Sequence, residues 1–140
     1  MKDTAKLLEE LQGFSSFSEF YDTNEKELGQ TTLSEALGKL IKDKGLIKSE
    51  IVERAEMSEV YAYQILSGVK TNPKREKVLC LAVGMQLSFS ETQDLLKRCG
   101  YAQLYTKNPC DAIVIYGLCK KYTLVQINEL LYEYGQETLG

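Results

Sequence analysis

Residues 47–73 read IKSEIVERAEMSEVYAYQILSGVKTNP, and this stretch decides which fold we expect. Its apolar residues recur at helical spacing, first over 48–55 and then over 58–67, with a very short turn between the two segments. Ser58 is a suitable N-cap for the second segment, and Gly68 is a suitable stop. The stretch therefore predicts two short helices that cross at a tight turn.

The rest of the chain also favours helices, and no window alternates in the manner of a strand. Boundary signals divide residues 32–135 into seven helices. The start signals outside the opening stretch are Thr32 with Glu35, Asn72 before Pro73, Ser88 with Glu91, Asn108 before Pro109, and Thr123 with Gln126. We expect an all-α fold without an internal repeat.

Residues 1–30 differ from the remainder and form a helix and arm of their own. The segment AKLLEELQ predicts a short helix, whereas GFSSFSEFYDTNEKELGQT mixes aromatic residues with serine, glycine and acids. We expect Phe14, Phe17 and Phe20 to staple this arm onto the body. A segment that binds a partner is the alternative.

Composition excludes several classes of function. The 140 residues carry a net charge of −3 and no histidine, and the four cysteines form no C-x-x-C pair, so we expect buried reduced thiols, no metal site and no His-dependent triad. We find no nucleophile beside a base and no phosphate-binding loop, and we expect neither an enzyme nor a cofactor. Without 18 consecutive apolar residues or a secretory signal, we expect a cytoplasmic protein that does not enter the membrane.

Two short helices at this spacing are typical of a helix-turn-helix, whose first helix crosses the DNA backbone and whose second lies in the major groove. With its flanks, the stretch resembles the phage-repressor family (Cro/C1, or xenobiotic-response-element, XRE). The resemblance is carried by a preceding helix, LSEALGKLIKDKG, an acid after the start of the next helix, a second helix that ends in a glycine, and a basic loop before Pro73. The turn position that is often glycine in this family is Glu56.

The resemblance covers about residues 33–87 and implies a repressor-like bundle of about five helices over 31–87. Residues 88–140 look like an α-helical extension found in some such regulators, which would form a homodimer or bind a protein partner. The implied function is a sequence-specific, DNA-binding transcriptional regulator of bacterial or phage type that acts on double-stranded DNA. A protein-interaction or regulatory module on the same scaffold, without DNA binding, is the alternative.

The resemblance also implies the roles of individual residues. Lys48 and Ser49 would meet phosphates or a base edge, and the face toward the groove would carry Ser58, Glu59, Val60, Tyr61 and Gln64. Gln64 suits adenine, and Val60 suits a thymine methyl group. Lys70, Lys74 and Arg75 would bind backbone phosphates.

Charge and helical position add two expectations. Residues 39–77 hold nine basic and six acidic residues, whereas the rest of the chain holds eight basic and fourteen acidic ones, so positive charge is concentrated around the motif. Tyr61 and Gln64 lie three residues apart on one helical face, which predicts that Tyr61 is largely exposed and that Tyr63 is partly buried.

Overall fold

The computed structural model describes residues 4–19 and 31–140. The chain divides into two compact units, Met1–Gln30 and Thr31–Gly140. In the first unit, α1 spans Thr4–Gly13, so the short N-terminal helix is present. Phe17 is 64% exposed and Phe20 lies outside the described residues, so the stapling of the arm stays a prediction.

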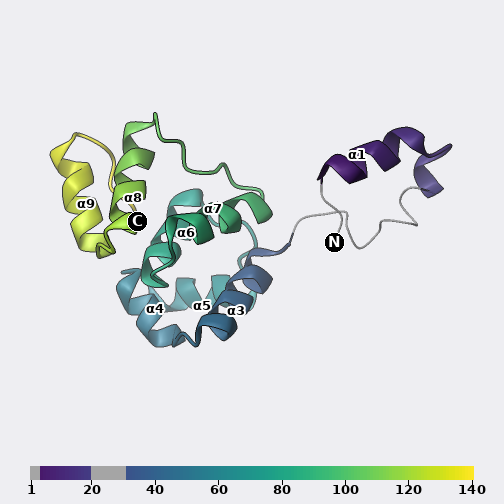
Figure 1. Ribbon diagram of the computed structural model, residues 1–140. Helices are drawn as coiled ribbons and strands as arrows, with labels where there is room; N and C mark the ends of the chain where they lie inside the picture. The colour runs from purple at the N-terminus through teal and green to yellow at the C-terminus, as the bar shows by residue number, and fades with distance from the viewer. Residues whose placement is uncertain (1–3, 20–30) are drawn as a thin grey trace. The chain divides into compact units, whose positions relative to one another are not determined.

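The second unit contains seven helices, and all regular structure in the described ranges is helical, which confirms the all-α fold. None of the described helices is long and apolar enough to cross a membrane. The helices are α3 (Leu33–Lys44), α4 (Lys48–Arg54), α5 (Glu59–Ser67), α6 (Arg75–Gly84), α7 (Phe89–Arg98), α8 (Pro109–Cys119) and α9 (Leu124–Glu133) (Figure 1).

Most helix starts lie where the sequence predicts them, because their signals act within one turn. Ser88 and Thr123 each form a complete capping box with the residue three positions on, and Asn108 caps α8 ahead of Pro109. Thr32 accepts a hydrogen bond from the backbone N–H of Glu35. Gly45 and Gly68 end α3 and α5 in the left-handed conformation.

The start of α6 is an exception, since the predicted cap at Asn72 and Pro73 was wrong. The N-cap is Lys74, and the helix begins at Arg75. The carbonyl oxygen of Pro73 does not open the helix but accepts a hydrogen bond of 2.5 Å from the Tyr101 hydroxyl. A long-range contact therefore holds Pro73 outside the helix.

One hydrophobic core joins the helices of the second unit. The centre of this core is α6, which packs against α4, α7 and α9. Residues 78–85 are all buried, including Cys80. The four cysteines are free thiols, as expected, but the expectation that they are buried holds for Cys80 alone, because Cys119 is exposed and the other two are half-buried.

Three tight turns in this unit share one backbone pattern. A left-handed residue follows the C-cap, then comes an apolar residue, and then a serine or threonine that caps the next helix. The left-handed residues are Glu56 (φ +49°), Gln86 (φ +56°) and Lys121 (φ +59°), and they link α4 to α5, α6 to α7 and α8 to α9.

The structure shows a likeness that the sequence does not, because α8–α9 follows the backbone geometry of α6–α7 at an interval of 35 residues. Gln93 on α7 bonds through its side-chain amide to the backbone N–H and C=O of Leu104, at 2.7 and 3.1 Å. Asn128 on α9 does the same with Leu139, at 2.8 and 3.1 Å. Few residues are identical between the copies, so the repeat lies in shared backbone geometry rather than in sequence.

Candidate nucleic-acid interface

The backbone of α4 lies very close to the backbone of α6, and this contact helps to hold α4 and α5 to the core. A Cβ placed on Gly84 of α6 would lie 2.6 Å from the carbonyl oxygen of Ile51, so α4 can reach α6 only over a glycine. Arg54 strengthens the same contact by donating from Nε to the Gly84 carbonyl at 2.8 Å. On the inner face of α5, the side chains of Ala62 and Ile65 are completely buried. The outer faces of α4 and α5 are left to the solvent.

The residues predicted to meet DNA fall into two groups by exposure. Seven are exposed, and three are half-buried. The exposed residues are Lys48, Ser49, Ser58, Glu59, Val60, Lys70 and Lys74, and the half-buried ones are Tyr61, Gln64 and Arg75.

Of the two tyrosines of α5, Tyr63 is partly buried as predicted, whereas the prediction that Tyr61 is largely exposed was wrong. Tyr63 is 37% exposed, whereas Tyr61 is half-buried and packs against the core. Tyr61 lies one turn before the fully buried Ile65, and residues four apart share a helical face. Pairing Tyr61 with Gln64 instead of Ile65 gave the helix the wrong rotation.

The loop that follows α5 is tied to the body at both ends. The backbone N–H of Lys70 donates to the carbonyl of Gln64 at 3.0 Å, and Tyr101 bonds to Pro73 at the other end. Burial raises the pKa of the Tyr101 hydroxyl, which keeps the proton that this bond requires. Lys70 and Lys74 therefore extend from a restrained loop.

Arg75 is committed to contacts inside the protein. Its two terminal nitrogens pair with both carboxylate oxygens of Asp111, at 3.0 and 3.1 Å, and it also donates to the carbonyls of Ala102 and Gln103. These bonds occupy four of its five N–H donors. We therefore assign Arg75 to the joint between α6 and α8 rather than to a phosphate contact.

Sequence reasoning missed Lys77, on the first turn of α6. The ammonium groups of Lys70 and Lys77 each lie 5.8 Å from the ring centre of Tyr61, within the range of cation–π attraction. The signal was present, because Lys77 follows Lys74 by nearly one helical turn. We name Tyr61, Lys70, Lys74 and Lys77 the basic ridge.

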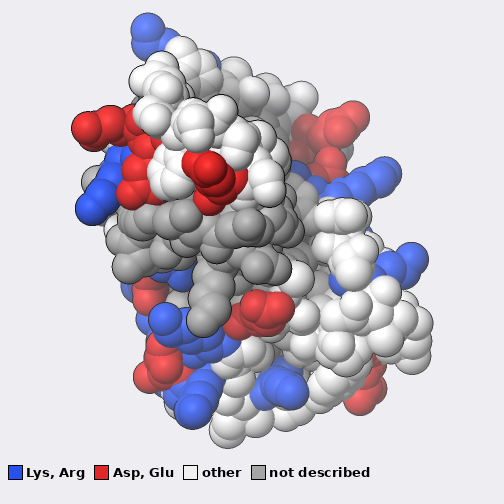
Figure 2. All heavy atoms as spheres, turned by 90° about the vertical axis from the view of Figure 1, so that its right-hand side faces the viewer, with Lys and Arg blue, Asp and Glu red and all other residues white. Residues whose placement is uncertain are grey.

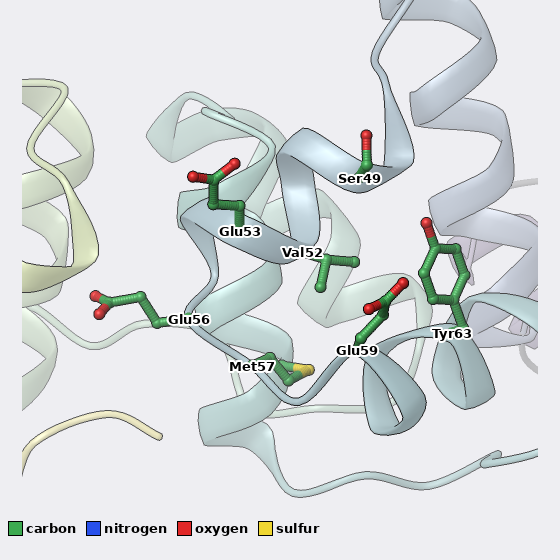
Figure 3. Close-up of a pocket in the computed structure, with 7 residues that line it drawn as sticks. All are labelled: Ser49, Val52, Glu53, Glu56, Met57, Glu59 and Tyr63. Carbon is green, nitrogen blue, oxygen red and sulfur yellow. The ribbon is translucent and has the colours of Figure 1, made fainter.

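The N-terminal end of α5 is acidic. Between α4 and α5 lies a hollow of about 310 Å³, and three of its seven lining residues are glutamates (Figure 3). In Figure 3 the side chains of Glu59 and Tyr63 extend toward the same side, whereas Glu56 points away from them. The lining residues are Ser49, Val52, Glu53, Glu56, Met57, Glu59 and Tyr63.

Charge on this part of the chain is thus divided between two places. Residues 48–68 hold two basic and four acidic residues, whereas residues 69–77 hold four basic and one acidic. Figure 2 shows basic and acidic side chains interspersed over the face in view. The positive charge near α5 comes from the loop and the start of α6, and not from α5 itself.

Comparison with protein-family models, with curated proteins and with solved structures finds no match to this chain. Among the described residues, no group of histidine, cysteine, aspartate and glutamate side chains is arranged to hold a metal ion.

Proposed function

We propose that the protein is a sequence-specific DNA-binding transcriptional regulator of the bacterial or phage type, with α5 in the major groove. The observation that carries the proposal is the basic ridge beside α5. The ammonium groups of Lys70 and Lys77 flank the half-buried Tyr61 of α5, and the exposed Lys74 lies between these two lysines in the chain. Backbone phosphates are the partners that such a row of ammonium groups would bind.

The turn before α5 supports the same function. In the repressor family that the sequence resembles, the turn is often made by glycine, and here Glu56 adopts the left-handed conformation that glycine favours. Ser58 then caps α5 by accepting from the backbone N–H of Tyr61 at 3.3 Å. Val60, which is 70% exposed, and Gln64 are the side chains that we assign to base edges.

The proposal is tested by measuring the affinity for DNA from upstream of the protein's own gene over a series of salt concentrations. Each phosphate contact contributes about 0.9 to the slope of log affinity against log salt concentration. Changing Lys70, Lys74 and Lys77 together to alanine should flatten that slope by about 2.7 and weaken binding to every sequence equally. The control changes Lys97 and Lys107, two exposed lysines outside the ridge, and should leave the slope unaltered. An unaltered slope in the triple variant would remove the ridge from the interface.

Reading of bases has a separate test at Gln64. Gln64→Ala should relax the preference at one base pair, at a cost of about 1–3 kcal/mol there, and should spare nonspecific binding. A parallel fall in specific and nonspecific affinity would show that Gln64 is not a reader.

The acidic hollow supports a second candidate, a protein-interaction module that does not bind DNA. Glu53, Glu56 and Glu59 would repel phosphates, and two apolar side chains nearby, Val60 and Val69, are 70% and 73% exposed. The same DNA titration separates the two candidates. If the protein binds neither the upstream DNA nor unrelated DNA at low salt, the result would favour the interaction module.

A further inference from the structure

The three tight turns of the second unit meet around one hollow. The hollow has a volume of about 330 Å³. Its lining includes all three non-glycine residues that have a left-handed backbone in the described ranges. Each of these residues directly follows the C-cap of a helix, where the left-handed conformation ends the helix. The lining residues are Glu53, Arg54, Glu56, Val83, Gln86, Lys121, Tyr122, Thr123, Leu124 and Val125.

The lining combines apolar surface with charges of both signs. Val83 and Leu124 are buried, and Tyr122 and Val125 extend the apolar part toward solvent. Two carboxylates come from α4 and its turn, and a lysine comes from the turn between α8 and α9. A ligand that fills this hollow would need an apolar group together with a positive and a negative charge.

The charged groups of the hollow have capacity for such a ligand. The carboxylates of Glu53 and Glu56 make no hydrogen bond or ion pair with another residue in the described ranges, although the backbone N–H of Glu56 donates to the Glu53 carbonyl at 3.1 Å. The Lys121 ammonium makes one long bond, of 3.4 Å, to the Gln86 carbonyl. Arg54 uses Nε for Gly84, and its Nη1 lies 3.8 Å from Glu50, so its terminal nitrogens retain donors.

We propose that this hollow binds a free α-amino acid with an apolar side chain. The ligand's ammonium group pairs with Glu56 and Glu53, its carboxylate pairs with Lys121, and its side chain packs against Tyr122 and Val125, the apolar lining residues that keep open surface. A volume of about 330 Å³ lies at the lower end of the range of small-ligand sites, about 300–1,000 Å³, which suits a molecule of this size. The inference is independent of DNA binding.

The experiment titrates L-leucine and L-phenylalanine into the isotope-labelled full chain and follows backbone amide shifts by NMR. We expect saturable shifts in the millimolar range or tighter, confined to the three turns and the start of α9. Leucinamide and N-acetyl-leucine each lack one charge, and glycine lacks the apolar group. All three should bind about tenfold more weakly than leucine, because each loses one class of contact.

Two variants and two controls locate the site. Glu56→Gln and Lys121→Gln should each weaken leucine binding about tenfold, and both should fold, because Gln86 already adopts this conformation in the related turn. Glu59→Gln and Lys120→Gln change exposed residues outside the hollow and should leave binding unaltered. The proposal is overturned if neither amino acid gives saturable shifts, if glycine binds as well as leucine, or if both hollow variants bind normally.

Discussion

Replacing Arg75 with alanine tests the structural role that we assign to this residue. The variant removes a two-bond ion pair from Asp111, whose side chain is only 9% exposed, whereas that of Arg75 is 29% exposed. Removing one partner of a fully buried pair costs about 3–5 kcal/mol, because the other charge is left unpaired.

Two features reduce that cost here. Arg75 is partly solvated, and Asp111 keeps a hydrogen bond of 2.9 Å from the backbone N–H of Tyr105. Asp111 also lies in the first turn of α8, where the helix dipole favours a negative charge. We therefore expect the variant to lose about 2–3 kcal/mol of unfolding free energy, and roughly 8–12 °C in melting temperature.

The assay is chemical denaturation followed by circular dichroism, with Arg98→Ala as the matched control. Arg98 forms an exposed ion pair with Asp94 on its own helix, so its removal should change the free energy of unfolding by less than about 0.5 kcal/mol. If Arg75→Ala is as stable as the control and instead flattens the salt dependence of DNA binding by about one unit, our reasoning fails. Arg75 would then face phosphate, as the resemblance to the repressor family implies.

Three further predictions rest on local geometry. Gly84→Ala should cost about 1–3 kcal/mol in a denaturation series, because its Cβ would press on α4, whereas Gly38→Ala meets no atom within 4 Å and should be neutral or stabilising. Burial raises the pKa of the Cys80 thiol from 9.0 to about 11. The contribution of this thiol to the free energy of unfolding should be complete below pH 9, and about 2–3 kcal/mol should be lost as the pH rises from 9 through 11. The Cys80→Ala variant should lack this loss, and an identical dependence of stability on pH in the two proteins would contradict the prediction. Asn128→Ala should release the backbone of Leu139, costing about 1–2 kcal/mol, and hydrogen exchange at the Leu139 amide should become fast; continued protection would show that other contacts hold this segment.

Helix positions in this protein were predictable because their signals are local. Ser88 and Thr123 cap helices through bonds that span three residues, and Gly45 ends α3 through its own backbone freedom. These interactions are complete within one helical turn, so seven helices could be placed from the chain alone. The outward position of Val60 on α5 followed from helical periodicity.

The sequence by itself thus determined the helices and where most of them begin, and tertiary structure decided what their side chains do. Arg75 lies 36 residues from Asp111, and Pro73 lies 28 residues from Tyr101, so no local pattern marks either contact. The rotation of α5 depends on which neighbours cover Tyr61, and those neighbours arrive with the loop and α6. The hollow among the three turns exists only because packing of α4, α6 and α9 brings together residues that are far apart in the chain. The partner of a side chain depends on which residues lie near it in space. The capping residues and helix-ending glycines, in contrast, act on residues that are close in the chain.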